Sequence, residues 1–423
     1  MIRKIVPQTE FARNVVTLMT GTTIAQAIPI AISPLLTRIY TPKDFGVLAL
    51  FISIIAILGS IANARYELAI MLPEKDEDAI NIFALGFIIN CTLSLFFMLL
   101  AIGFNDYFTE LLDNEEIGFW LYFVPLSVFF IGLFNLLNYF NNRRKNYKDL
   151  KNAVIIKSIF LAVIQLSIGL VKTGASGLIS GQIISNFFAN TKLLVNILKD
   201  KKLVAKISKN KIIFLAKRYI TFPKYSVLAI LFNNLSQHLI SILISSLFNI
   251  ITLGFYSLVQ RVLGMPSTLI GSSIGQVFFQ QASQEKQKTG LAIKSFNSAV
   301  KKLLIIGMPL FVFIYLTVEP LFIFVFAEEW RVAGYYAKLI CPLFFIRFVV
   351  STVSPIDTVM EKQNIYLLFN IVLLITSLAI IYISHNELFE VFLVRYSMII
   401  SIIYILYGFL LRYMAKGKLK ALR

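Results

Sequence analysis

Charged residues are scarce in this chain of 423 residues. Only 15% are Asp, Glu, Lys or Arg, whereas soluble domains usually carry about 25%. Hydrophobic residues make up 58% of the chain, and the mean hydropathy is +0.78. The sequence does not supply the polar surface that a soluble domain of this size needs, which excludes a water-soluble enzyme.

Cysteine and histidine are rarer still. The two cysteines, Cys91 and Cys341, lie within apolar runs, so neither a disulfide framework nor a thiolate metal site is indicated. The two histidines, His238 and His385, are far apart in the sequence, which argues against a histidine zinc site. A GxxxxGK[ST] phosphate-binding loop is absent, and no loop is long enough to hold a catalytic domain. We therefore expect no metal ion, no cofactor and no catalytic residues.

The sequence consists largely of long charge-free runs. It lacks the alternating polarity of outer-membrane β-strands. A run of about 18 apolar residues indicates a transmembrane helix. Seven charge-free runs satisfy this criterion, at 14–37, 45–64, 79–105, 117–142, 173–191, 262–284 and 363–386. Four shorter or interrupted runs also qualify, at 152–171, 303–318, 339–356 and 391–411.

One further run, 225–260, carries no charge for 36 residues. As a single helix it would measure about 54 Å, against a hydrocarbon core of about 30 Å. It must therefore turn, most naturally at 249–254, and its second part continues into 262–284. The predicted fold class is an all-α polytopic membrane protein with about twelve transmembrane helices.

The distribution of Lys and Arg predicts the orientation. With the N-terminus in the cytoplasm, the cytoplasmic segments hold 28 Lys and Arg and the opposite loops hold five. Basic loops stay in the cytoplasm, so both termini are expected there. The same bias explains the net charge of +18, and no nucleic-acid partner is expected. The segments counted as cytoplasmic are 1–13, 73–78, 143–151, 199–218, 285–302, 361–363 and 412–423.

A basic segment near the midpoint divides the predicted spans into two sets of six. We predict a six-helix lobe at 1–198, a basic cytoplasmic linker at 199–218 and a second six-helix lobe at 219–423. A shift of 208 residues places Gly46 on Gly254, each near the start of the second span of its half. Because six is an even number, the repeats would be parallel, with a site between the lobes reached by alternating access.

Four arginines lie within or at the ends of predicted spans: Arg65, Arg261, Arg347 and Arg395. A charge near the bilayer centre is costly and normally faces protein or a wet cavity. Arg347 lies about 12 Å from the outer end of its span, close to the midplane. Because a guanidinium binds phosphate bidentately and keeps its proton, the four could line a cationic, substrate-binding pathway. Alternatively, Arg395 extends outward to water, and Arg65 extends inward or pairs with a nearby acid.

Three other polar groups are candidates for ion or proton coupling. Glu67 and Asp357 are acids placed at the ends of predicted spans, and His238 lies in the middle of the seventh span. A hydrogen-bonded structural histidine is the alternative for His238. A proline in a membrane helix bends it where the backbone borders protein or water, and Pro266 follows Arg261 by five residues. That kink favours a cavity on the eighth span.

Several stretches give the chain a family likeness. They are residues 34–50 (PLLTRIYTPKDFGVLAL), residues 65–73 (RYELAIMLP) with the acidic loop that follows, and residues 253–266 (LGFYSLVQRVLGMP). With them the chain resembles bacterial polysaccharide-biosynthesis flippases of the Wzx type, which export O-antigen units. These belong to the multidrug/oligosaccharidyl-lipid/polysaccharide exporter superfamily. The resemblance covers essentially the whole chain.

The resemblance implies a two-lobed protein of the bacterial inner membrane. Such a protein flips an undecaprenyl-diphosphate-linked oligosaccharide to the periplasmic leaflet, for O-antigen or capsule synthesis. Its implied partners are that lipid-linked substrate, membrane lipids, a polysaccharide polymerase and a chain-length regulator. Arg65, Arg261 and Arg347 match the implied cationic cavity by residue type and depth.

Three other functions compete with this one. A cation-coupled multidrug antiporter of the same superfamily would favour acids in its cavity, whereas Arg outnumbers acids in these spans. A membrane enzyme, such as a polysaccharide polymerase or an acyltransferase, would show a long polar outer loop or a His/Asp cluster. A purely structural membrane protein would have little need for arginines within its spans.

Overall fold

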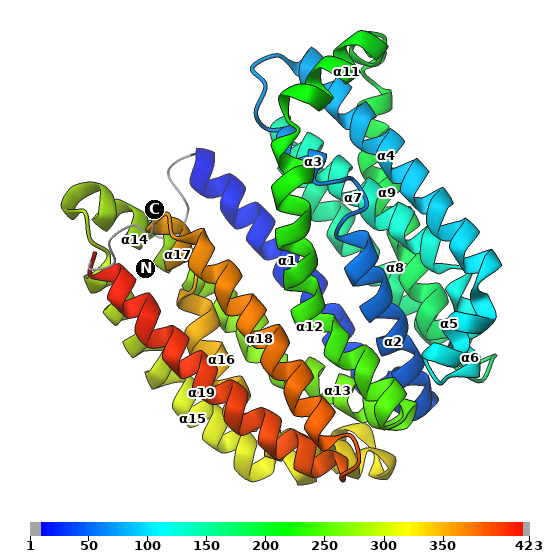
Figure 1. Ribbon diagram of the computed structural model, residues 1–423, viewed down its shortest axis with the longest axis vertical. Coiled ribbons are helices and arrows are strands. Elements are labelled where there is room, and N and C mark those ends of the chain that lie inside the picture. Colours follow the sequence, from blue (N-terminus) through cyan, green and yellow to red (C-terminus); the bar gives the residue numbers. More distant parts are fainter. Residues whose placement is uncertain (1–9, 418–423) are drawn as a thin grey trace, which may run out of the picture. The chain divides into compact units, whose positions relative to one another are not determined.

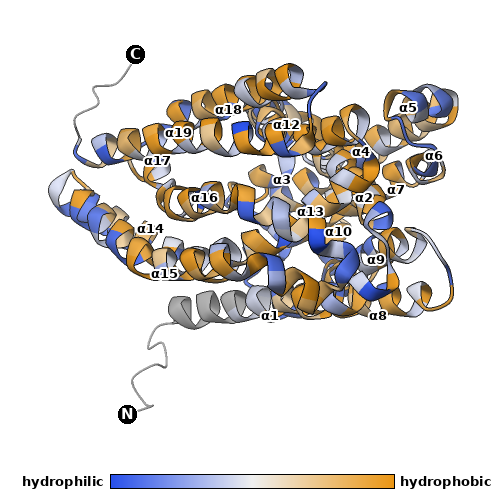
Figure 2. Cartoon of the chain, turned by 90° about the horizontal axis from the view of Figure 1, so that it is seen from below, coloured by the Kyte–Doolittle hydropathy of each residue, from blue (hydrophilic) through white to orange (hydrophobic). Residues whose placement is uncertain are grey.

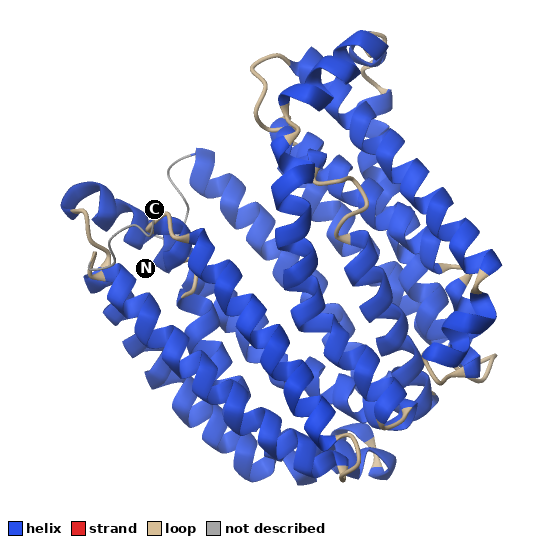
Figure 3. Ribbon diagram, in the orientation of Figure 1, coloured by secondary structure: helices blue, strands red, loops and turns tan. Residues whose placement is uncertain are grey.

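The structure is a computed structural model that describes residues 10–417, with side chains from Thr20 onward. Across this part of the chain the regular elements are helices joined by short loops, and no strand forms (Figure 3). The all-α prediction is confirmed. The basic residues Arg3 and Lys4, the side chain of Arg13 and residues 418–423, all counted in the orientation argument, lie outside the described part.

Contacts divide the chain into two compact units, residues 1–234 and residues 235–423. The boundary falls inside helix α12, which therefore belongs to both units (Figure 1). The first unit contains α1 (Glu10–Ile39), α2 (Pro42–Gly59), α3 (Tyr66–Ala69), α4 (Asp76–Gly103), α5 (Asn105–Leu111), α6 (Glu115–Leu121), α7 (Val124–Arg143), α8 (Tyr147–Gly169), α9 (Ser176–Leu198), α10 (Lys201–Val204), α11 (Lys209–Arg218), a π-helical turn (Phe222–Ser226) and the start of α12 (Val227–Leu247).

The second unit continues from α12. It contains α13 (Ile250–Pro266), a π-helical turn (Ser267–Gly271), α14 (Ser272–Thr289), α15 (Ile293–Phe326), a 3₁₀ turn (Glu328–Trp330), α16 (Arg331–Val353), α17 (Ile356–Val359), α18 (Gln363–Ser384) and α19 (Phe389–Ala415). Hydrophobic residues cover most of its long helices, whereas the far end of α14 is hydrophilic (Figure 2).

Ten helical segments in the described part are long and apolar enough to cross a membrane. The other two of the twelve predicted spans also form helices, α1 with 30 residues and α9 with 23. Helix α9 carries several polar residues, namely serines, asparagines and a glutamine. On α9, Asn190 donates a hydrogen bond to the Phe130 carbonyl of α7 at 2.9 Å. Such bonds let polar residues join membrane helices.

Glycines allow α8 and α9 to pack closely beside Tyr40. The Tyr40 hydroxyl donates to the Gln165 carbonyl of α8 at 2.6 Å. A Cβ placed on Gly177 would lie only 2.0 Å from the Tyr40 hydroxyl oxygen, and one on Gly181 would lie 2.6 Å from Cγ of Gln165. Small residues at helix contacts are what bring membrane helices together, because lipid tails provide no hydrophobic driving force between them.

The predicted repeat is visible in how two helices begin. Helix α2 follows the N-cap Thr41 and α13 follows the N-cap Asn249, again 208 positions apart. Each cap side chain accepts a hydrogen bond from the backbone N–H three residues on, that of Asp44 or Thr252. These bonds satisfy a donor that the first helical turn leaves without a partner. Gly46 and Gly254 are each the fifth residue of their helix.

The predicted linker, 199–218, forms α10 and α11, and both pack on α4 of the first unit. Its basic residues meet the acidic start of α4, where Glu77 pairs with Lys206 and, at 2.9 Å, with Lys211. At the same end of α4, Asp76 accepts from Arg143 at 2.9 Å. Opposite charges on predicted cytoplasmic segments thus hold this end of the first unit together.

Candidate functional site

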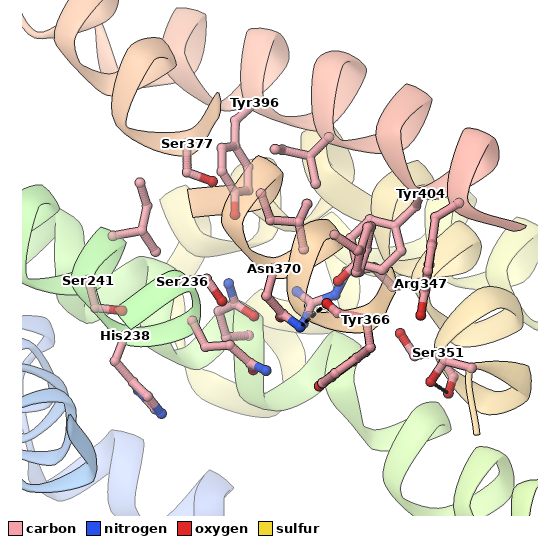
Figure 4. Close-up of a pocket in the computed structure, with 18 of the residues that line it drawn as sticks. Ser236, His238, Ser241, Arg347, Ser351, Tyr366, Asn370, Ser377, Tyr396 and Tyr404 are labelled. Atoms are coloured by element: carbon pink, nitrogen blue, oxygen red, sulfur yellow. Dashed lines mark hydrogen bonds between the residues drawn. The ribbon is translucent and has the colours of Figure 1, made fainter. Parts of the chain in front are cut away.

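A cavity of about 460 Å³ lies within the second unit. Helices α12, α13, α16, α18 and α19 supply its walls. The lining is unusually polar for a membrane helix bundle, with five tyrosines, several serines and three amide side chains. Figure 4 shows labelled residues of α12, α16, α18 and α19 around this space. A site this polar can take a hydrophilic group and hold it by hydrogen bonds.

Arg347 is the cation of the cavity. It lies on α16, and its guanidinium carbon is 5.3 Å from the ring centre of Phe344 and 5.8 Å from that of Tyr404. Aromatic faces at such distances attract a cation without neutralising it. Among the described residues, no carboxylate lies within ion-pair distance of Arg347, and none lines the cavity. The positive charge is therefore left for an anionic ligand.

Tyrosine and amide groups surround this charge. Gln260 of α13 donates to the Tyr256 hydroxyl at 2.5 Å. Asn370 of α18 donates to the Tyr366 carbonyl of its own helix at 2.8 Å, so its side-chain oxygen is left to accept. Hydroxyls, amides and aromatic faces are suited to sugar hydroxyls, because they offer both donors and acceptors.

Asp357 lies next to the cavity rather than in its wall. The sequence places it at the end of the tenth span, but α16 ends at Val353 and Asp357 belongs to the short helix α17. Pro355 explains the break, because proline cannot continue the hydrogen-bonding pattern of a helix. The buried Asp357 carboxylate accepts from the Thr358 hydroxyl at 3.0 Å and from the Tyr407 hydroxyl, a cavity residue, at 3.5 Å.

His238 lies on α12 and lines the cavity. A role in ion or proton coupling requires such a position. Arg261 lies on α13 directly after Gln260, which faces the cavity, but it is not among the described lining residues. At Pro266, where the sequence predicts a kink, α13 ends and a π-helical turn follows.

Arg395 lies on α19 but away from the cavity. It pairs with Glu387 at 2.5 Å and donates to the Ser384 hydroxyl at 3.1 Å. Both partners of this ion pair are about two-fifths exposed. The structure therefore gives Arg395 an acidic partner near the start of α19 and does not bring it together with Arg347.

Arg65 and Glu67 belong to the first unit. The sequence places both at the end of the second span, but α2 ends at Gly59 and the backbone turns before α3 begins. Ala64 and Arg65 both have positive φ angles, of 46° and 65°, which an α-helix cannot accommodate. The apolar run continues through this turn, so the hydrophobic pattern does not reveal where the helix ends.

The two residues form an ion pair, with 3.1 Å between Arg65 Nη1 and Glu67 Oε1. Glu67 is buried and Arg65 is partly exposed. Burial raises the pKa of the Glu67 carboxyl despite the nearby guanidinium, which makes it a group able to hold a proton. Since these residues and the cavity lie in different units, a pathway shared by all four arginines stays a prediction.

Metal binding finds no support in the described part of the chain, where no three His, Cys, Asp or Glu side chains are grouped as ligands. The two histidines are likewise not grouped with other ligands in the described part of the chain. His238 lies in the cavity, whereas His385 Nδ1 donates to the Tyr382 carbonyl at 2.6 Å.

The tyrosines and amides of the cavity were missed by the search for charges. Their spacing could have revealed them. On α18 the lining residues recur at the period of one helix face, from Tyr366 through Asn370 to Ser377, and on α19 they run from Tyr396 through Tyr404. Polar residues repeating every three or four positions within an apolar helix mark a wet face.

Sequence comparison finds one family. Residues 35–334 match a family described as polysaccharide biosynthesis protein. A search of the curated proteins finds no match.

Solved structures of two kinds of transporter are similar to the chain. The lipid II flippase MurJ, in an inward closed conformation, has a TM-score of 0.73 at 12% identity, covering 94% of this chain and 86% of that one. An inward-facing multidrug resistance MATE family transporter of the MOP superfamily has a TM-score of 0.66 at 13% identity, covering 96% of both chains.

A third similar structure is a MOP superfamily transporter from Pyrococcus furiosus, described for the reverse polarity of its binding pocket. Its TM-score is 0.59 at 12% identity, again covering 96% of both chains. At such identities the likeness is one of fold, and the fold is that of multi-pass membrane transporters.

Proposed function

The chain belongs to the polysaccharide biosynthesis protein family, and we propose that it flips a lipid-linked oligosaccharide carrying a diphosphate across the bacterial inner membrane. It would do so by alternating access, delivering the repeat unit of a surface polysaccharide such as O-antigen or capsule. A polymerase and a chain-length regulator would then act on the delivered units.

The cavity of the second unit is the observation that carries the proposal. Its cation, Arg347, has aromatic neighbours and no carboxylate partner in the described chain. A diphosphate offers the complementary charge, and a guanidinium can bind it through paired hydrogen bonds. The tyrosine, serine and amide groups around it can replace water around sugar hydroxyls. Both halves of the proposed head group thus find suitable partners.

A cation-coupled drug antiporter fits this cavity less well. A cationic drug binds best beside a carboxylate, or among aromatic rings where no other cation lies. Arg347 would repel it. The Asp357 carboxylate accepts from the Tyr407 hydroxyl at 3.5 Å, but Asp357 does not itself line the cavity. A membrane enzyme is also a weaker alternative, because the similar solved structures are transporters.

Reconstitution tests the proposal. The full chain in liposomes should move a fluorescent polyprenyl-diphosphate oligosaccharide from one leaflet to the other, measured with a membrane-impermeant quencher. Liposomes with a non-phosphorylated polyprenyl glycoside provide the control, which should move more slowly because Arg347 has no anion to bind. Equal rates for both lipids, or no movement above protein-free liposomes, would contradict the proposal.

Cells give a second measurement. Deleting the gene should leave the lipid-linked unit assembled but confined to the cytoplasmic leaflet. Failure to assemble the unit would instead indicate an enzymatic role.

A further inference from the structure

A groove on the other side of α16 and α19 is separate from the cavity. Helix α16 packs against both α15 and α19, which contact each other much less, so α16 forms the floor and the other two form the walls. The groove has a volume of about 570 Å³. Its sides are almost entirely hydrocarbon, contributed by residues such as Leu304, Val349 and Phe409.

The faces of the two shared helices separate groove from cavity. On α16, Arg347 and Ser351 line the cavity, while Val349 and Val353 line the groove. On α19 the same division holds between Tyr404 and its neighbour Ile405. A ligand of the groove therefore need not enter the proposed substrate site.

Two cations line this apolar groove. Lys301 lies on α15 and Arg412 on α19, and both line the groove. Neither forms an ion pair with any carboxylate of the described chain, although each side chain is exposed. Asn297, one turn before Lys301, adds an amide to the lining. The groove thus offers two positive charges and hydrogen-bond donors, with no acid in the lining.

A backbone hydrogen bond joins the start of α15 to the end of α19. The Ala292 N–H, just before α15, donates to the Ala415 carbonyl at the end of α19 at 3.0 Å. Lys301 is followed three and four residues later by Leu304 and Ile305, which point to the same helix face. Each cation thus lies within one helical turn of apolar lining residues, Lys301 near Leu304 and Arg412 near Phe409.

We propose that this groove binds an anionic phospholipid, with its phosphate between Lys301 and Arg412 and an acyl chain along α16. Basic pockets between transmembrane helices at a membrane surface bind anionic head groups. Lys301 and Arg412 fall in the segments predicted as cytoplasmic, where such lipids would approach. Large apolar side chains at the rim, Ile305 and Phe409, are more than half exposed and would cover the chain.

The groove continues beyond this site. A second hollow of about 510 Å³ is lined by the same three helices farther along α16, and Ile346 lines both. An acyl chain extended along α16 could therefore continue from the first hollow into the second, toward the N-terminal end of α16.

Lipid binding to the purified full chain tests the proposal. Native mass spectrometry would measure retention of phosphatidylglycerol and of phosphatidylcholine with the same acyl chains. Phosphatidylglycerol should be retained preferentially. The variant Lys301→Gln/Arg412→Gln should weaken that preference by roughly fivefold for each cation removed. The matched control Lys302→Gln/Lys416→Gln removes the same charge from neighbouring residues outside the groove and should leave the preference intact.

A second pair of variants tests the acyl-chain site without changing charge. Ile305→Trp would fill the groove and should lower retention of phosphatidylglycerol several-fold, whereas Ile306→Trp, one residue on and outside the lining, should not. Equal loss in both charge variants, equal retention of both lipids, or unchanged binding in Ile305→Trp would overturn the proposal. Displacement of phosphatidylglycerol by equimolar polyprenyl diphosphate would also overturn it, because the groove would then hold substrate. None of these results depends on whether the chain flips an oligosaccharide.

Discussion

The Arg347 guanidinium lies against the Tyr404 ring, 5.8 Å from its centre, with the Phe344 ring on another side at 5.3 Å. Pairing with aromatic faces leaves the charge able to exchange partners, whereas a buried ion pair would hold it in place. A transporter must release what it binds, so a cation held this way suits transient binding of an anion. The same arrangement makes Arg347 the most informative residue to change.

Replacing Arg347 should impair transport without removing the protein. Arg347→Ala removes charge-assisted hydrogen bonds worth about 1.5–3 kcal/mol, which corresponds to a loss of roughly tenfold or more in transport rate. Arg347→Lys should restore only part of the rate, because an ammonium lacks the guanidinium fork. Export per folded molecule is the quantity to measure, in liposomes or in cells.

The matched control for this prediction is Arg395→Gln. Arg395 is also an arginine within a long helix, but it pairs with Glu387 at the start of α19. Its loss should leave transport within about twofold, since exposed ion pairs contribute about 0–1 kcal/mol. Full transport by Arg347→Ala at normal abundance would remove Arg347 from the site.

The orientation can be tested with single cysteines in a background lacking Cys91 and Cys341. Glu115 and Asn210 are both exposed, on the predicted outer loop and the predicted cytoplasmic segment respectively. Glu115→Cys should react with an impermeant thiol reagent added to intact cells, and Asn210→Cys should react only after the membrane is opened. Asn114 is less suitable, because its side chain caps α6 by accepting from the Ile117 N–H. Labelling of both sites from the same side would refute the predicted topology.

The buried acid of the first unit should make stability depend on pH. Burial raises the pKa of Glu67 from its usual value near 4.5, so the folded protein releases this proton at a higher pH than the unfolded chain does. Stability should therefore fall as pH rises from about 4.5 through the raised pKa. Melting temperatures between pH 5 and 8 should show this slope in the wild type, and Glu67→Gln should lack that part of it. Identical slopes for the two proteins would show that Glu67 does not titrate in this interval.

Packing between α8, α9 and Tyr40 predicts a pair of coupled substitutions. Gly177→Ala should destabilise the protein by about 1–3 kcal/mol, because its methyl group would meet the Tyr40 hydroxyl oxygen. Tyr40→Phe removes that oxygen together with its bond to the Gln165 carbonyl. The double variant should be more stable than the sum of the two single effects predicts. If the changes in melting temperature were strictly additive, the contact between the new methyl group and the Tyr40 hydroxyl would be relieved in another way.

The hydrophobic runs were sufficient to predict the helices, because a membrane requires every spanning backbone group to be bonded within its own segment. They were insufficient to locate where α2 ends. Ile61 and Ala62 are as apolar as the helix before them, although the backbone there already turns toward Arg65. Apolar content reports where a segment can be buried, whereas a turn depends on φ and ψ angles that it does not encode.

Charge pattern was a partial guide to the site. It selected Arg347 and His238, both of which line the cavity, but it also selected Arg395, whose partner Glu387 lies eight residues earlier. The uncharged lining was overlooked because tyrosine is ordinary in a membrane helix. Which side of α19 faces the cavity depends on packing against α16 and α18, and a single sequence reveals that only through the spacing of residues such as Tyr396 and Tyr404.

The π-helical turn after Pro266 has a consequence for how this helix can change over evolution. A π turn accommodates one residue more than an α-helical path, so it acts as an insertion that the helix has absorbed. One residue corresponds to a rotation of about 100° around the axis. Deleting a residue from Ser267–Gly271 would turn Phe278 and Ala282, now buried, away from their neighbours, while Gln260 would keep its place in the cavity. Insertions and deletions at this turn can thus reorient one half of the helix independently of the other.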